Sequence, residues 1–216
     1  MMPVITETPF DKRHCCWFCG EPNSGEFTFP DGERSAFNCP HVLLSVPSCD
    51  ECNKIAKSAA VHSIWQVNHF VKSSLMVRYN KHLAIGINWT EEELATSEFE
   101  HGNFAGFARS AWFVYEVARG RVNYQSWPLV IDGVEYYDSE PTLTFTFDDV
   151  VYPSLDYAIK HYAKTFFIDR HYFSAVLYKL SKGDITPRYF AQTVRFCRLL
   201  VNASATERQV AFKQLS

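Results

Sequence analysis

Apolar residues recur at intervals of three and four between residues 53 and 79, a stretch without glycine or proline. This spacing places them on one face of a helix with 3.6 residues per turn. The stripe consists of Ala60, Ile64, Val67, Val71 and Leu75. The pattern predicts one long amphipathic helix over residues 53–79.

A second long helical pattern covers residues 155–181, and one acidic residue, Asp169, falls within its apolar stripe. A buried carboxylate without a partner is costly. Either Asp169 pairs with a cation in the core, or the helix bends at this position. Thr186 and Pro187 then supply an N-cap and a first-turn proline for another helix. The inner face of that helix is predicted to contain Phe190, Val194, Cys197 and Val201.

Three shorter helices are indicated by their ends or by their pattern. Thr90 and Glu93 have the spacing of a capping box, which predicts the start of a short acidic helix. Residues 106–119 have the pattern of another helix, which is expected to end near Gly120. Thr206 with Gln209 predicts the cap of a final short helix.

The period changes to two in two parts of the chain. Residues 128–137 predict a hairpin with a two-residue turn at Asp132 and Gly133. Residues 143–147 alternate leucine and phenylalanine with threonine and predict a third strand. A Pro-Asp-Gly turn at residues 30–32 lies between two apolar alternations and predicts a further hairpin over residues 27–37.

These patterns predict an α+β fold that is mainly helical. We expect a loose N-terminal arm over residues 1–13 and a cysteine-rich module with its long helix over residues 14–80. Residues 81–216 are then a helical body that contains one three-stranded antiparallel sheet.

The composition is that of a globular protein, with 47% hydrophobic and 21% charged residues in a chain of 216. No apolar run reaches the roughly 18 residues that a membrane span needs. The N-terminus lacks the basic and apolar regions of a signal peptide. We therefore expect a cytoplasmic protein without membrane contact, whose seven cysteines are reduced and available for a metal.

The formal net charge of −3 conceals four blocks of alternating sign. Residues 53–90 carry five basic and no acidic residues, and residues 157–216 carry ten basic and three acidic residues. Residues 1–52 and 91–156 are acidic. Either the basic and acidic segments pack against each other, or a basic segment presents a phosphate-binding face.

Two Cys-x-x-Cys pairs are the strongest chemical signal in the sequence. Cys16 and Cys19 form the first pair, and Cys49 and Cys52 form the second. Zn²⁺ in structural sites prefers four soft ligands in a tetrahedron, and each pair supplies two thiolates. The spacing predicts a structural zinc ion at these four cysteines.

Other candidate ligands lie close by in the sequence. His14 and Cys15 compete with Cys16 for the first position, although the spacing from Cys15 to the next cysteine is less usual. Cys39 and His41 lie between the two pairs and are further candidates.

The order of elements, a cysteine knuckle, a hairpin and a second knuckle that opens a helix, resembles a treble-clef zinc finger. Two segments look like the zinc-stabilised branch of the HNH endonuclease family. They are the Cys-x-x-Cys-Gly string that ends at Gly20 and the segment 46–53, which is followed by a lysine in the helix. The resemblance covers roughly residues 14–60. It implies that residues 14–80 are an N-terminal treble-clef zinc module.

The resemblance also implies where catalysis would reside. In the family an Asp-His pair activates water, and a residue just after the last cysteine helps to hold a divalent metal. Asn53 matches that last position, and His41 is the only histidine between the knuckles. The Asp-His pair, the glycine-rich loop and the middle asparagine of the family are missing from this sequence. We therefore predict a module that kept zinc and lost catalysis. The alternatives are an HNH-type endonuclease that uses Mg²⁺ or Mn²⁺ with His41 and Asn53, and a structural-zinc protein–protein adaptor.

The resemblance further implies that the basic helix contacts nucleic acid, or a protein associated with nucleic acid. The candidate contact residues are Lys54, Lys57, Lys72 and Arg78. A second candidate phosphate-binding face lies on the last two helices, which carry Arg188, Arg195, Arg198 and Arg208.

Overall fold

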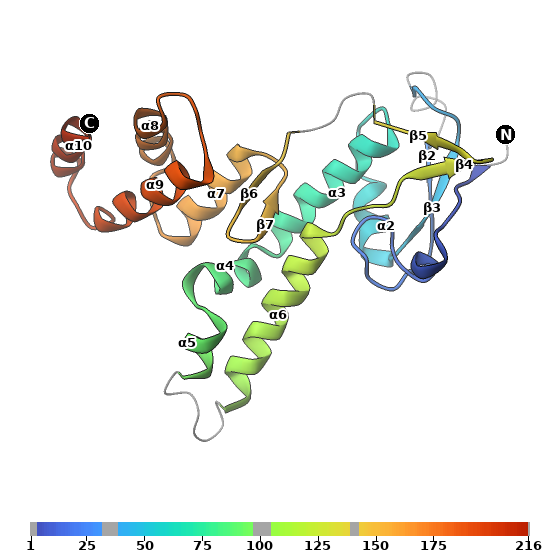
Figure 1. Ribbon diagram of the computed structural model, residues 1–216, viewed down its shortest axis with the longest axis horizontal. Coiled ribbons are helices and arrows are strands. Elements are labelled where there is room, and N and C mark those ends of the chain that lie inside the picture. Colours follow the sequence, from blue (N-terminus) through green and yellow to red (C-terminus); the bar gives the residue numbers. More distant parts are fainter. Residues whose placement is uncertain (1–3, 32–38, 97–104, 139–142, 216) are drawn as a thin grey trace. The chain divides into compact units, whose positions relative to one another are not determined.

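The computed structural model describes residues 4–31, 39–96, 105–138 and 143–215 (Figure 1). The chain divides into two compact units, Met1–Leu143 and Thr144–Ser216, called unit 1 and unit 2 below. The fold is α+β and mainly helical, as predicted. None of the helices in the described ranges is long and apolar enough to cross a membrane.

A small three-stranded sheet begins unit 1. It contains β1 (Val4–Ile5), β3 (Leu44–Ser48) and β2 (Gly25–Phe29) in that order, with β1 parallel and β2 antiparallel to β3. The short 3₁₀ helix η1 (Phe10–Lys12) follows β1. β2 pairs with β3, whereas the turn and the second strand of the hairpin expected over residues 27–37 fall largely on residues 32–38, outside the described ranges.

Within the loose arm expected over residues 1–13, residues 4–7 are instead paired with other segments. β1 pairs with β3, and the Thr6 hydroxyl donates a hydrogen bond of 3.0 Å to the Ser45 carbonyl oxygen. Glu7 forms an isolated antiparallel bridge with Val130. Partners far along the chain therefore order this segment, and no local pattern in the sequence indicates them.

The helix predicted over residues 53–79 is two helices, α2 (Asp50–Ala56) and α3 (Ile64–Arg78). The Ser58 hydroxyl bonds to the Ile55 carbonyl after α2, and the Ser63 side chain accepts a hydrogen bond from the Gln66 N–H at the start of α3. Local hydroxyl bonds of this kind compete with helix continuation. Four predicted stripe residues, Ile64, Val67, Val71 and Leu75, are buried, whereas Ala60 is exposed within the break.

Three helices continue unit 1, namely α4 (Asn80–Asn88), α5 (Glu91–Ala95) and α6 (Ala105–Asn123). The predicted capping box at the start of α5 is confirmed. α6 packs against both α3 and α4. A methyl group at Gly86 of α4 would lie 2.2 Å from the Tyr115 ring of α6, so glycine permits this close approach. Residues 81–143 therefore belong to the same compact unit as the cysteines, and no unit boundary falls near residue 80.

The predicted hairpin after α6 is confirmed as β4 (Leu129–Ile131) and β5 (Val134–Tyr136). Both residues of its Asp-Gly turn have positive φ, as a type I′ turn requires. The expected third strand, β6 (Phe145–Phe147), instead pairs with β7 (Val150–Tyr152) in unit 2. Asp148 and Asp149 adopt φ values of 47° and 56° in the turn between them. The predicted three-stranded sheet is thus two separate pairs. The sequence analysis did not predict β7, because an Asp-Asp turn is a weak signal for a hairpin.

Unit 2 combines β6 and β7 with α7 (Leu155–Thr165), α8 (Arg170–Ser181), α9 (Pro187–Leu199) and α10 (Ala205–Gln214). The helix expected over 155–181 is interrupted, and Asp169 is the exposed N-cap of α8, accepting from the Tyr172 N–H at 2.7 Å. The interruption, and not an ion pair, therefore explains this carboxylate.

The inner face of α9 is buried at Phe190, Val194 and Cys197, as predicted, while Val201 follows the helix and is half-buried. The last helix, α10, starts two residues earlier than the predicted cap at Thr206 and Gln209 implies. Its capping box is formed by Ser204 and Glu207.

Candidate metal centre

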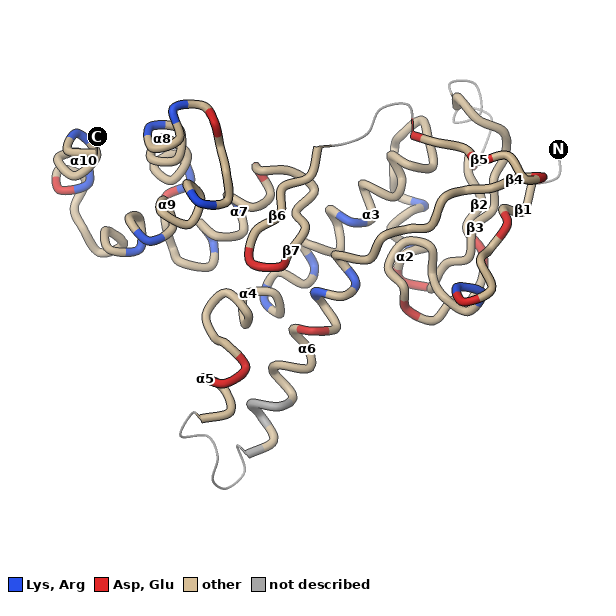
Figure 2. Tube along the Cα trace, in the orientation of Figure 1, with Lys and Arg blue, Asp and Glu red and all other residues tan. Residues whose placement is uncertain are grey.

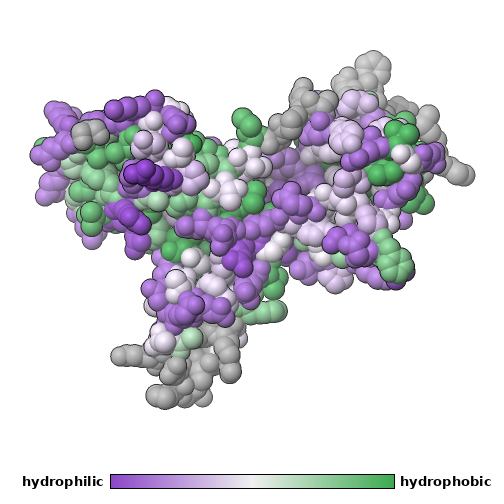
Figure 3. All heavy atoms as spheres, viewed as in Figure 1, coloured by the Kyte–Doolittle hydropathy of each residue, from purple (hydrophilic) through white to green (hydrophobic). Residues whose placement is uncertain are grey.

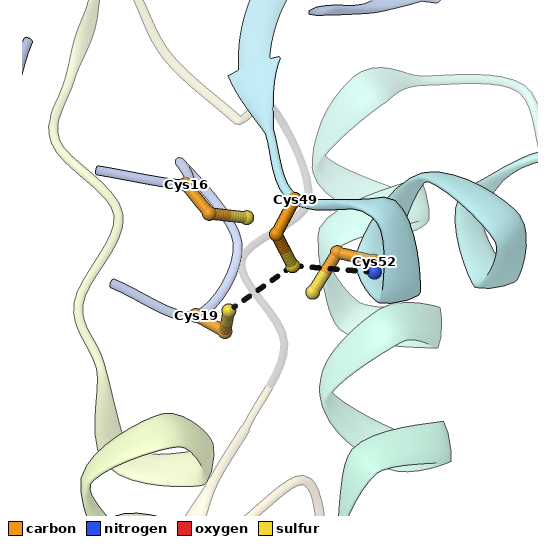
Figure 4. A group of neighbouring side chains, drawn as sticks. All are labelled: Cys16, Cys19, Cys49 and Cys52. Atoms are coloured by element: carbon orange, nitrogen blue, oxygen red, sulfur yellow. Dashed lines mark hydrogen bonds between the residues drawn. The ribbon is translucent and has the colours of Figure 1, made fainter. Parts of the chain in front are cut away.

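Four cysteines converge at the junction of the first knuckle, β3 and α2, where their sulfur atoms face one another (Figure 4). The Sγ atoms of Cys16, Cys19, Cys49 and Cys52 all lie within 4.8 Å of one another. The Cys19 and Cys49 sulfurs are 3.8 Å apart. Zn–S bonds of about 2.3 Å in a tetrahedron place sulfurs about 3.8 Å apart. The predicted ligand set therefore has the size of a tetrathiolate zinc site.

The first pair lies on a tight knuckle. The Cys16 N–H donates to the Glu21 carbonyl oxygen at 2.6 Å, and the Gly20 N–H donates to the Cys16 carbonyl oxygen at 2.9 Å. Gly20 has a φ of 77°, and a methyl group there would lie 2.5 Å from the Tyr124 ring. Glycine is needed at this position for both the turn and the packing.

The second pair belongs to the start of α2. Cys49 is the N-cap residue of this helix, and its Sγ accepts a hydrogen bond from the Cys52 N–H at 3.5 Å. Cys52 follows within the first turn. The free N–H groups at a helix start favour negative charge, so this position stabilises thiolates.

Hydrogen bonds among the four thiols shift their pKa values in opposite directions. Hydrogen bonding with Cys16 lowers the pKa of Cys19 to about 7 and lowers the pKa of Cys49 far below that of a free thiol. Hydrogen bonding with Cys19 raises the pKa of Cys16, and hydrogen bonding with Cys16 raises that of Cys52. A metal ion that replaces these protons would bind all four as thiolates and release the protons on binding.

The other candidate ligands lie outside this cluster. Within the described ranges, the four cysteines are the only group of three or more histidine, cysteine or acidic side chains placed to share a metal. Cys15 bridges to Pro22 beside the knuckle, and Cys39 is half-buried elsewhere. Cys197 is buried in the core of unit 2.

An arginine from α6 contacts the cluster, which the sequence did not indicate. Arg121, only 9% exposed, directs Nη2 toward the Cys19 sulfur at 3.6 Å and toward the Glu51 carboxylate at 2.6 Å. Glu51 precedes Cys52 in the first turn of α2. This side chain therefore joins α6 to both halves of the thiol cluster.

Glu51 is the centre of this polar network. It pairs with Arg78 at 2.5 Å and accepts a hydrogen bond from the Tyr79 hydroxyl at 2.8 Å. Burial opposes ionisation here, but hydrogen bonds from two arginines and a tyrosine hold the pKa of Glu51 below its usual range. The carboxylate stays charged and fixes Arg121 beside the thiols.

Lys72 of α3 adds a second cation near the cluster. Its Nζ donates to the carbonyl oxygens of Arg121, at 3.1 Å, and Tyr124, at 2.6 Å, where α6 ends. Burial lowers the pKa of Lys72 to about 8, while the charges of the cysteines oppose this shift. Zinc with four thiolates carries two net negative charges. Lys72 and Arg121 would offset them if zinc binds here.

The four basic residues that we predicted to contact nucleic acid differ in their surroundings. Lys54 is exposed on α2 and Lys57 is exposed at its C-cap, and neither forms a salt bridge with a described residue. Lys72 bonds to carbonyl oxygens of α6, and Arg78 is exposed but paired with Glu51. Part of the basic block is thus used within unit 1.

The two predicted catalytic residues both make structural hydrogen bonds. His41 Nδ1–H donates to the Val42 carbonyl oxygen at 2.8 Å, and its Nε2 accepts from the Ile64 N–H at the start of α3, at 2.9 Å. Burial lowers the pKa of His41. The Asn53 amide donates to the Glu26 carbonyl oxygen at 2.9 Å and to the Ser48 hydroxyl at 3.0 Å.

The two residues also contact different ends of β2. The His41 ring lies beside Phe29, whereas Asn53 bonds at Glu26. Three residues of strand span about 10 Å. The structure therefore does not bring His41 and Asn53 together at one reacting centre.

Comparison of the chain with protein-family models, with curated proteins and with solved structures finds no significant match. The interpretation of the site consequently depends on its geometry.

Proposed function

We propose that this protein is a non-catalytic zinc-binding protein of the treble-clef type that contacts nucleic acid through α2. The convergence of four thiols at zinc-ligand distances is the observation that supports this proposal most strongly. We infer a cytoplasmic environment for this protein, in which its thiols remain reduced.

The treble-clef assignment is supported by the order of the elements. A knuckle with Cys16 and Cys19 comes first, the β2–β3 pair follows, and Cys49 and Cys52 lie at the start of α2. Two ligands thus come from the knuckle and two from the first turn of a helix, which is the arrangement expected of this zinc module.

The absence of catalysis is inferred from the hydrogen bonds of His41 and Asn53. A general base needs a free lone pair within reach of its water. Both ring nitrogens of His41 are bonded to backbone groups. The alternative, an HNH-type nuclease with Mg²⁺ or Mn²⁺, predicts cleavage of DNA or RNA that is lost in both His41→Ala and Asn53→Ala. We expect no cleavage above background with either metal.

Contact with nucleic acid is inferred from Lys54 of α2 and Lys57 at its C-cap, which are exposed without an acidic partner among the described residues. Each phosphate contact contributes about −0.9 to the slope of log affinity against log salt on duplex DNA. If both lysines contact phosphates, Lys54→Ala with Lys57→Ala flattens this slope by about two units.

The matched control removes two other exposed lysines, Lys160 and Lys164 of α7, and therefore the same total charge. We expect the control to bind as the unaltered protein does. Equal binding by both double variants would contradict the proposed role of α2. It would favour the remaining alternative, a zinc-stabilised adaptor that contacts another protein.

A further inference from the structure

The pairing of α8 with α9 in unit 2 places an arginine-bearing helix at the surface. α8 ends at Ser181, Lys182 takes the left-handed conformation, and α9 begins at Pro187 after the N-cap Thr186. The two helices pack together through buried apolar residues, and their axes point in clearly different directions in Figure 1. Two helices joined by a short, glycine-containing turn can present the second helix to a groove of DNA.

The outward face of α9 carries cations and no carboxylate. Arg188, Gln192 and Arg195 are exposed at positions i, i+4 and i+7, so they lie in one row about 10 Å long. Arg198 is also exposed, and its guanidinium lies 4.3 Å from the centre of the Phe166 ring. No acidic residue occurs within α9. Figure 2 marks these basic positions along the helix.

Within the described ranges, none of the arginines of α9 forms a salt bridge. Residues 144–216 carry ten basic and six acidic side chains, so unit 2 is cationic although the chain as a whole is not. Figure 3 shows strongly hydrophilic groups on the visible face of this unit. One acidic residue, Asp184, lies in the turn before α9 and opposes this positive charge.

We propose that the exposed face of α9 binds duplex DNA, with Arg188 and Arg195 as its principal contacts and with Gln192 between them. The major groove admits one α-helix, and arginine and glutamine are the side chains that pair bidentately with guanine and adenine. Residues near the start of such a helix are those that reach the base edges.

A duplex suits this face better than a single strand does. Proteins that bind single strands present aromatic side chains on which bases stack. The exposed row on α9 contains two arginines and a glutamine but no aromatic residue. This inference depends on unit 2 alone and is independent of the zinc site and of α2.

The test compares duplex binding by the full chain and by the Arg188→Ala, Arg195→Ala double variant, with a mixed-sequence duplex titrated at several salt concentrations. We expect affinity at low salt to fall at least ~10-fold and the salt slope to flatten by about two units. The Lys160→Ala, Lys164→Ala variant loses the same charge from α7 and should bind as the unaltered protein does. Asp184→Asn should bind more tightly, because it removes the only carboxylate of the turn.

Several results would overturn the inference. They are the absence of duplex binding at low salt, unchanged binding by the arginine variant, and tighter binding of a single strand or an acidic peptide through the same arginines. Loss of binding in the Lys54→Ala, Lys57→Ala variant alone would support contact through α2 and reject α9. Loss in the arginine variant alone would support α9 and reject α2. All of the replaced side chains are exposed, and matching thermal unfolding curves would show that each variant folds.

Discussion

Unit 1 contains a cluster of thiols and charges beside its apolar core, whereas the core of unit 2 is centred on one aromatic ring. In unit 1 the four cysteines, Glu51 and Arg121 form one connected polar centre. In unit 2 the Phe190 ring lies within 5.3 Å of the rings of Phe145, Phe147, Tyr162 and Phe173, measured between centroids. The first feature has the geometry to hold a metal ion, and the second depends on close packing alone.

This difference means that each unit can be disturbed separately. All five tryptophans, Trp17, Trp65, Trp89, Trp112 and Trp127, belong to unit 1. Tryptophan fluorescence therefore follows unit 1, and hydrogen exchange in α7, α8 and α9 follows unit 2. The predictions below use this separation, from the largest expected effect to the smallest.

Removing the metal should have the largest effect. We expect about one zinc per chain, and Cys49→Ser should release it and unfold the surroundings of the cluster, since structural zinc sites supply apparent binding energies of about 10–16 kcal/mol. Metal analysis and tryptophan fluorescence measure this, and hydrogen exchange in unit 2 should not change. Cys15→Ser is the matched control, because Cys15 lies outside the cluster. Purified protein without zinc would contradict the prediction.

Truncating the central ring of unit 2 should have the next largest effect. Phe190 is 0% exposed, and Phe190→Ala should lower the free energy of unfolding of unit 2 by about 3–5 kcal/mol. Zinc content should stay the same. Leu199→Ala, at a residue that is 85% exposed on the same helix, should cost almost nothing. Loss of zinc in the Phe190 variant would show that the two units are not independent.

The arginine that contacts the thiols should matter for metal affinity. Arg121→Leu should lower zinc affinity about 10- to 100-fold, the usual cost of losing a group that orients a metal ligand. Competition with a zinc-binding dye measures this. Arg119→Leu, two residues earlier on α6, removes the same charge and should leave the affinity unchanged. Equal effects of both changes would show that only net charge matters.

Acid should weaken unit 1 through His41. Its pKa is lowered by burial, so the unfolded chain binds this proton more readily than the folded protein does. The folding free energy therefore becomes less favourable as pH falls below the ordinary histidine range, and protonation of Nε2 breaks its bond to the Ile64 N–H. The free energy of unfolding, followed by tryptophan fluorescence at several pH values, should fall with pH less steeply in His41→Gln than in the unaltered protein. The variant should also lose about 1 kcal/mol at neutral pH. The same variant should have no effect on zinc content.

The N-cap of α8 should have the smallest effect. Asp169→Ala removes the bond to the Tyr172 N–H and should cost about 1 kcal/mol in unit 2. Asp169→Asn, which can still accept this bond, should cost less. Hydrogen exchange at the start of α8 distinguishes the two variants. An equal loss in both would mean that the charge, and not the cap, stabilises this helix.

Signals that are complete within a few residues could be predicted from the sequence. The two Cys-x-x-Cys pairs, the capping box at Thr90 and the Asp-Gly turn of the β4–β5 hairpin all appear where we expected them. Within each cap, turn or Cys-x-x-Cys pair, the residues involved lie only a few positions apart. Local sequence therefore contains all the information that these features need.

Other features were decided only when distant segments came together. The break between α2 and α3 is accompanied by the bond from the Ile64 N–H to His41, and β1 is ordered by its pairing with β3. Arg121 lies 102 positions from Cys19, yet it becomes part of the metal centre. A buried charge is stable only beside its partners, and the partners of Arg121 are assembled by the packing of α6 on α3. The sequence alone determined the four ligands, and the tertiary structure decided which charges surround them.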